Sequence, residues 1–102
     1  MSGQIDMALH APARLQIAAM LARADEVEFA TIREVTEVSD SVLSKPLTAL
    51  ADAGYVKIVK APRDGRQRTW ASLTRTGRSA FAAHMEALRA LAAAAEEAVA
   101  TR

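Results

Sequence analysis

The chain has 102 residues and an apolar fraction of 51%, which is enough for one domain over residues 1–102 with its own hydrophobic core. It contains no cysteine, which excludes a disulfide framework, a thiolate zinc site and a cysteine nucleophile and agrees with a reducing compartment. It shows neither a basic segment followed by an apolar targeting run nor the roughly 18 apolar residues of a membrane span, so we expect a cytoplasmic protein.

The net charge of +1 hides an uneven distribution of charge along the chain. Residues 1–44 carry 3 basic and 7 acidic side chains, residues 45–78 carry 8 basic and 2 acidic, and residues 79–102 carry 2 basic and 3 acidic. The basic character therefore lies in the middle third, which favours a polyanionic partner for that region. The alternative is an ordinary solvated surface.

Residues 12–24 predict the first helix, because Pro12 suits a first helical turn and apolar side chains recur at helical spacing. Its expected buried stripe is Leu15, Ala18, Ala19 and Ala22, with Ile17 and Leu21 beside it. The following "DEVEFA" places Val27 and Phe29 at a period of two, which indicates a brief strand or an extended connector.

A helix-turn-helix is predicted over residues 31–53. Thr31 and Glu34 have the T-x-x-E spacing of a capping box, in which each side chain accepts the free backbone N–H of the other residue at the start of a helix. The expected buried edge of this helix is Ile32, Val35 and Val38.

The second helix of this pair begins near Asp40, with Ser39 or Asp40 as its cap, and ends before Gly54, which suits a left-handed C-terminal cap. Its inward stripe is Val42 or Leu43, Leu47 and Leu50. Its opposite face is Ser41, Ser44, Lys45 and Thr48. Pro46 removes one backbone hydrogen bond inside this helix, at a cost of ~3 kcal/mol or more unless the helix bends. We expect a complete helix from about Asp40 with a kink, rather than a later start with Ser44 as the cap.

Residues 55–73 predict a β-hairpin, because "YVKIVK" and "RTWASL" alternate in polarity. Pro62 and Gly65 in the intervening "APRDGRQ" are turn residues, so the hairpin has a flexible, basic tip. Trp70 is expected to pack within the hairpin, since a lone aromatic side chain is a poor platform for single-stranded nucleic acid.

Residues 75–101 predict a long helix opened by Thr74. So small a domain cannot bury the whole apolar face of this helix, and its many alanines allow a second helix to approach closely. We therefore expect a homodimer rather than a helix folded back on its own core. The expected dimer residues are Phe81, Met85, Leu88, Leu91, Ala92, Ala95 and Val99, with His84 at the edge of the stripe.

The order helix, short strand, helix, turn, helix, basic hairpin and long helix is that of a winged helix-turn-helix domain, a mainly α fold with a small β-hairpin wing. A short, hydroxylated helix face fits a DNA major groove and offers hydrogen bonds to phosphates and base edges. The basic hairpin tip can reach the neighbouring backbone or a minor groove. The tip residues that would do so are Arg63, Arg66, Gln67 and Arg68.

The chain resembles the MarR-like winged-helix transcriptional regulators, in particular their short single-domain bacterial members. "SVLSKPLTALADAGYVKI" matches the family pattern L-S-x-x-L-x-x-L-x-x-x-G-Y-V, and "WASLTRTGRSAF" matches L-T-x-x-G-R-x-x-F. With "ARLQIAAML", the match spans about residues 9–90. The resemblance implies a dimer paired through the chain ends. We expect it to bind double-stranded DNA and to regulate transcription as a repressor that occludes a promoter.

The resemblance also assigns residues to the DNA interface. It implies recognition-helix contacts at Asp40, Ser41, Ser44, Lys45 and Thr48 and wing contacts at Arg63, Arg66 and Arg68. The chain departs from the family at Pro46, where members usually carry a polar or basic residue, and this departure leaves the list of base contacts open.

Other functions have little support in the residues. His10 and His84 lie far apart in the sequence, and neither a Ser-His-Asp arrangement nor a glycine-rich phosphate loop surrounds them, so we expect no catalytic residue and no cofactor. Asp6 with His10, and His84 with Glu86, are too loosely spaced to predict a metal site. A small-molecule effector could lie between the first helix, the wing base and the last helix, but no polar cluster identifies one. The main alternative is a winged helix that binds a protein partner and whose wing never meets DNA.

Overall fold

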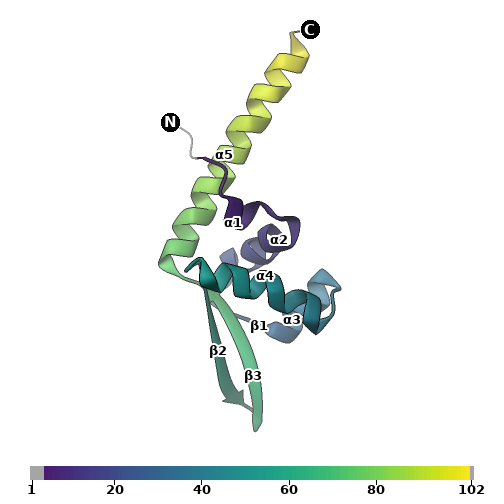
Figure 1. The fold of residues 1–102 in the computed structure, drawn as a ribbon, viewed down its shortest axis with the longest axis vertical. Coiled ribbons are helices and arrows are strands. Elements are labelled where there is room, and N and C mark those ends of the chain that lie inside the picture. The colour runs from purple at the N-terminus through teal and green to yellow at the C-terminus, as the bar shows by residue number, and fades with distance from the viewer. Residues whose placement is uncertain (1–3, 102) are drawn as a thin grey trace.

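The structure, a computed structural model, describes residues 4–101 (Figure 1). Its elements are α1 (Met7–His10), α2 (Pro12–Ala22), β1 (Val27–Glu28), α3 (Phe29–Thr36), α4 (Asp40–Asp52), β2 (Val56–Arg63), β3 (Arg66–Leu73) and α5 (Arg75–Ala100). The predicted winged-helix architecture is confirmed, including the short strand and the long last helix. The four-residue helix α1 was not predicted.

The three strands form one antiparallel sheet in the order β1-β3-β2, and β2 with β3 forms the wing, defined here as Val56–Leu73. Asp64 and Gly65 close the hairpin with φ angles of 54° and 76°, the left-handed pair that a two-residue type I′ turn requires. The prediction of a longer tip is therefore wrong. Pro62 lies in β2 opposite Gln67 rather than in the turn, and Arg66, Gln67 and Arg68 lie in β3.

The hydrophobic core lies between α2, α3, α4 and the base of the wing. Its buried members are Leu9, Ile17, Ala18, Leu21, Ile32, Leu43, Leu47, Leu50, Val56, Ala71 and Leu73. In α2 the buried face is centred on Ile17, Ala18 and Leu21, whereas Leu15 is half-buried, so the predicted stripe is rotated toward the residues placed at its edge. Ile17 and Leu21 are larger than the alanines of α2, so burying them determines which face of the helix turns toward the core.

Helix α3 begins at Phe29, two residues earlier than predicted. Its N-cap is Glu28, which makes no side-chain capping bond, so the predicted Thr31–Glu34 capping box is wrong. The reason is that the chain passes from β1 directly into the helix, and Phe29 packs against the core as it does so. Val35, predicted to be buried, is 55% exposed.

Helix α4 starts where the sequence predicts, with the Ser39 hydroxyl accepting a hydrogen bond from the Val42 N–H at 3.4 Å. It continues through Pro46, and Gly54 follows its end with a φ of 81°. Leu43 points into the core and Val42 is 55% exposed, which decides between the two candidates for the inward stripe. The kink at Pro46 stays a prediction.

The start of α5 is tied to the junction between α4 and β2. The Thr74 hydroxyl accepts from the Gly77 N–H at 2.9 Å and donates to the Gly54 carbonyl at 2.7 Å, and the Thr74 N–H donates to the Tyr55 carbonyl at 3.0 Å. A Cβ at position 77 would lie 2.1 Å from the Tyr55 oxygen, so only glycine permits this approach. Arg78 donates to two carbonyls at the C-terminal end of α2, at 3.4 and 3.1 Å. The L-T-x-x-G-R sequence is therefore a structural joint.

The N-terminal segment is bound to α5 and to the wing root by one polar network. The Asp6 N–H donates to His84 Nδ1 at 3.0 Å, and the Tyr55 hydroxyl donates to Asp6 Oδ2 at 2.6 Å. This hydrogen bond, with burial and the carboxylate charge, raises the pKa of Tyr55. His84, predicted at the edge of a stripe, is fully buried, and its Nε2 has no hydrogen-bond partner within residues 4–101.

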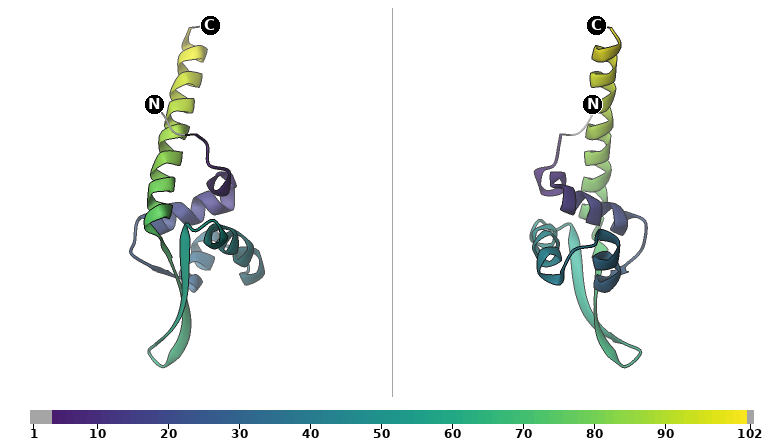
Figure 2. Two further views of the ribbon diagram at one scale, coloured as in Figure 1. Left: turned by 60° about the vertical axis from the view of Figure 1, so that its left-hand side comes forward. Right: turned by 90° about the vertical axis from the view of Figure 1, so that its right-hand side faces the viewer.

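Helix α5 extends away from the domain on the side opposite the wing (Figures 1 and 2), giving extents of 61 × 26 × 20 Å. Its first half faces the domain, where Gly77, His84 and Ala87 are buried. From Leu91 to Thr101 every residue is exposed. The second half of α5 therefore makes little contact with its own domain.

Candidate nucleic-acid interface

One face of α4 carries only exposed polar side chains. These residues, called the outer face here, are Asp40, Ser41, Ser44, Lys45 and Thr48. All five were predicted from the sequence as recognition-helix contacts. The opposite face of α4 is fixed in the core by Leu43, Leu47 and Leu50, so the outer face is held on a rigid support.

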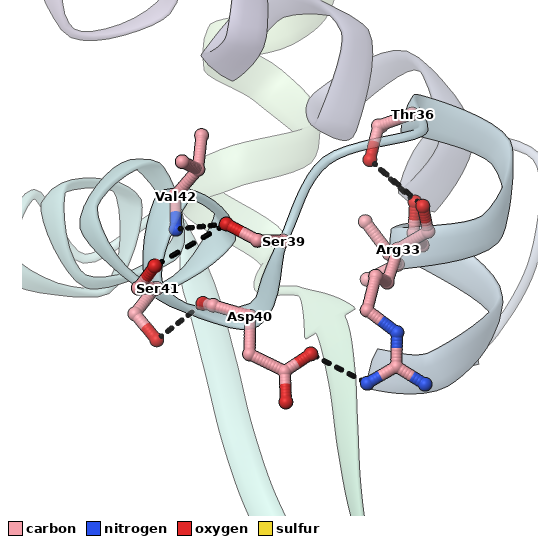
Figure 3. Close-up of polar contacts among 8 residues, drawn as sticks. Arg33, Thr36, Ser39, Asp40, Ser41 and Val42 are labelled. Carbon is pink, nitrogen blue, oxygen red and sulfur yellow. Dashed lines mark hydrogen bonds and ion pairs between the residues drawn. The ribbon is translucent and has the colours of Figure 1, made fainter.

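Hydroxyl groups at the start of α4 are ordered by local hydrogen bonds (Figure 3). The Ser39 oxygen lies 3.2 Å from that of Ser41, and the Ser44 hydroxyl donates to the Asp40 carbonyl at 3.0 Å. A hydroxyl that donates internally keeps its lone pairs free for an incoming donor. These serines are therefore oriented before a ligand arrives.

Arg33 of α3 and Asp40 of α4 form an ion pair between the two helices of the helix-turn-helix (Figure 3). Their side chains are 41% and 67% exposed. The hydrogen bond to the carboxylate and its negative charge raise the pKa of Arg33. Arg33 was missed by the sequence analysis, because its position seven residues before Asp40 reveals the contact only when the geometry of the turn is known.

Two hollows flank the outer face of α4. One, of about 520 Å³, lies between α4 and the wing and is lined by Asp40, Ser44, Thr48, Ile58, Lys60 and Thr69 among others. The other, of about 400 Å³, lies on the side of α2, where Arg14 adds a positive charge next to Lys45. Lys60 and Arg14 thus extend the basic surface on both sides of α4.

The three predicted wing arginines have different surroundings. Arg68 binds both carboxylate oxygens of Glu28 at 2.8 and 3.1 Å, and the two side chains are 32% and 19% exposed. Arg63 pairs with Glu26 at 2.9 Å, and its guanidinium carbon lies 4.5 Å from the centre of the Trp70 ring. Arg66 has no ion-pair partner in the part of the chain that the structure describes. Two of the three arginines therefore hold the wing to the segment around β1.

The structure brings only part of the predicted interface together. Asp40, Ser44 and Thr48 line one hollow with the wing strands. Arg66, Gln67 and Arg68 instead line a hollow of about 460 Å³ against α3, which also includes Glu28 and Glu34. The wing arginines thus lie beside acidic groups that the sequence analysis did not connect with them.

The predicted dimer residues divide along α5. Phe81 packs against the core of its own chain, and Met85 and Leu88 are half-buried. The remaining four are exposed: Leu91 (61%), Ala92, Ala95 and Val99 (73%). An exposed apolar surface therefore begins at Leu91.

Within residues 4–101 no three carboxylate or imidazole groups are arranged to hold a metal ion, although the rings of His10 and His84 lie 5.7 Å apart. None of the helices in this range is both long enough and apolar enough to cross a membrane.

Known proteins give a consistent picture of the fold. The chain is similar to a transcriptional regulator homologue from Pyrococcus horikoshii, with 26% identity and a TM-score of 0.81 over 85% of this chain and 86% of that one. It is also similar to YusO from Bacillus subtilis (24%, TM-score 0.73, 81% of this chain) and to NadR in complex with 4-hydroxyphenylacetate (23%, TM-score 0.70, 90% of this chain). It spans only 58% and 64% of those two chains.

No curated protein matches the chain. A family model described as a winged helix DNA-binding domain matches residues 13–92, which include α3, α4 and the whole wing. Together with the similar structures, this match confirms the predicted resemblance to MarR-like regulators. The chain belongs to the winged helix DNA-binding domain family.

Proposed function

We propose that this protein is a sequence-specific regulator of transcription that binds double-stranded DNA with α4 in the major groove and the wing on the flanking backbone or minor groove. The outer face of α4 carries the proposal: five exposed polar side chains on a helix whose other side is locked into the core. A recognition helix needs such a face, because large apolar groups would collide with the groove. We further propose that it acts as a repressor by occluding the promoter to which it binds.

The wing would contribute electrostatic contacts. Arg66 supports this role most directly, because no carboxylate binds it in the described part of the chain and Gln67 is exposed beside it, while Lys60 lies farther up the hairpin in the hollow next to α4. Arg63 and Arg68 would have to exchange Glu26 and Glu28 for phosphates, which makes their contribution smaller than their charge suggests. Each phosphate contact made by a cation steepens the dependence of affinity on salt by about one unit.

The protein would act as a cytoplasmic homodimer paired through the second half of α5. The exposed apolar Leu91 and Val99 lie among small alanines on the half of α5 that its own domain leaves uncovered, and a second copy packed against this surface would explain them better than solvent exposure. Two recognition helices would then contact half-sites one DNA turn apart, about 34 Å. Sedimentation of wild type and of Leu91→Asp tests this. A dimeric wild type and a folded, monomeric Leu91→Asp variant would support pairing through this surface, and identical masses for the two proteins would contradict it.

Selection of bound duplexes from a random pool at about 150 mM salt tests the DNA function. The expected result is an inverted repeat with half-sites about 10 base pairs apart, bound less tightly by Lys45→Ala. A pool that never enriches would favour the alternative, a winged helix that binds a protein partner through α5. An effector of the kind bound to NadR would be a separate finding, detected as a ligand that changes the affinity for the selected site.

A further inference from the structure

Asp40, which belongs to the outer face of α4, pairs with Arg33 of α3 (Figure 3). We propose that this pair is a base-reading unit that selects one G·C base pair in the major groove, with the guanidinium on guanine and the carboxylate on the cytosine amino group. The proposal rests on the DNA-binding function proposed above and specifies what the start of α4 recognises.

The pair has unused hydrogen-bonding groups that point outward. The contact joins one guanidinium nitrogen, Nη1, to one carboxylate oxygen, Oδ1. Arg33 Nη2 and Asp40 Oδ2 make no hydrogen bond to any residue in the range 4–101. One donor nitrogen and one acceptor oxygen of the pair are therefore free for a ligand, while the contact between Nη1 and Oδ1 holds the two side chains together.

The chemistry of the major groove restricts what such a pair can bind. A carboxylate needs a donor, and the only donors on base edges there are the amino groups of cytosine and adenine. The guanidinium needs acceptors, and guanine offers two, O6 and N7. In a G·C pair the two acceptors lie side by side on guanine and the donor lies on the paired cytosine, so one guanidinium and one carboxylate can bind them together. An A·T pair offers no two adjacent acceptors, because the adenine amino donor lies between adenine N7 and thymine O4.

The position of the pair also favours base contact over a role in stability. Asp40 is the first residue of α4 and lines the hollow shared with Ser44 and Thr48, and the N-terminal residues of a recognition helix are those that contact base edges. Both side chains are largely exposed, and exposed ion pairs contribute little to stability. Even when paired with Arg33, a carboxylate near the DNA backbone contributes nothing to phosphate binding, whereas its free oxygen can accept from the amino group of a base.

Selection of duplexes by wild type, Asp40→Ala, Asp40→Asn and Arg33→Ala tests the proposal. Wild type should fix a G·C pair at one position of each half-site. Asp40→Ala should reduce the preference at that position about tenfold or more and leave the other positions unchanged. Asp40→Asn should shift the preference there to A·T, because an amide binds adenine through two hydrogen bonds. Arg33→Ala should weaken the choice of guanine at the same position.

The matched control is Arg89→Ala, which removes the exposed Arg89–Glu86 pair on α5 and should leave every base preference unchanged. Thermal unfolding checks that each variant is folded. Unchanged base preferences in both Asp40 variants would overturn the proposal, and so would an Arg33→Ala variant that only flattens the salt dependence. Either result would leave the DNA-binding function intact. If the wild-type pool never enriches, the DNA-binding function and the proposal fall together.

Discussion

Replacing Gly77 with alanine should destabilise the protein, although alanine is the better helix former by about 1 kcal/mol. The new Cβ would lie 2.1 Å from the Tyr55 oxygen, so α5 must move by roughly 0.9 Å merely to reach 3.0 Å. That movement disrupts the two hydrogen bonds from Thr74 to the Gly54 and Tyr55 carbonyls, each worth about 1 kcal/mol. Overpacking adds about 1–3 kcal/mol. The net loss is therefore about 2–4 kcal/mol of unfolding free energy.

Urea and thermal unfolding followed by circular dichroism measure this loss. For a domain of this size it corresponds to a fall in melting temperature of about 10 °C or more. Ala83→Gly is the matched control, because position 83 is exposed in the same helix, and it should cost only the helix-propensity difference of about 1 kcal/mol. If Gly77→Ala is as stable as wild type, or more stable, the close approach between α5 and Tyr55 does not hold the fold together.

Three further predictions concern the wing, the recognition helix and the wing root. Arg66→Ala should flatten the slope of DNA affinity against salt by about one unit and leave the stability unchanged. Equal salt slopes for Arg66→Ala and wild type would exclude Arg66 from the interface. Arg68→Ala should instead lower the unfolding free energy by about 1–3 kcal/mol, because it leaves the poorly exposed Glu28 without its partner. Pro46→Ala should raise the unfolding free energy by about 1–3 kcal/mol, because the helix already continues through this position and alanine restores the missing backbone donor. Urea unfolding measures this change, and a lower stability of the variant would contradict the prediction. The raised pKa of Tyr55 means that its hydrogen bond stabilises the fold below about pH 10, where the unfolded tyrosine is still protonated, and that this stabilisation is lost as pH rises through the raised value. The stability difference between wild type and Tyr55→Phe should therefore stay constant up to about pH 10 and shrink as the pH rises above it, and a difference that stays constant above pH 10 as well would count against the hydrogen bond.

The sequence predicted the elements well, because their signals are local. The spacing of Leu43, Leu47 and Leu50 and the cap positions of Ser39 and Thr74 are each readable within a few residues. The start of α3 was predicted wrongly because a good capping box competed with the burial of Phe29, and burial prevailed. Local patterns therefore locate a helix better than they locate its ends.

The candidate interface was predicted less completely, because its missing parts depend on contacts between distant segments. All five residues of the outer face were identified, since a helix exposes one face whenever the opposite face is apolar. The pairing of Arg68 with Glu28 joins residues 40 positions apart, and no periodicity reveals it. Likewise His84 carries no sequence sign that it accepts a hydrogen bond from the backbone of Asp6.

The joint at Thr74 makes α5 a lever arm. The helix has 26 residues and is therefore about 39 Å long, so a tilt of about 5° at its base displaces the far end by roughly 3 Å. Because Thr74 is bonded to Gly54 and Tyr55, the end of α4 and the root of the wing must follow the same rotation. In the proposed dimer, two copies would be held together at the far ends of their α5 helices, and the angle at this joint would determine the distance between their wings. A molecule that alters this angle would change the spacing of DNA half-sites that the two copies can span. It could do so without contacting any residue that faces the DNA.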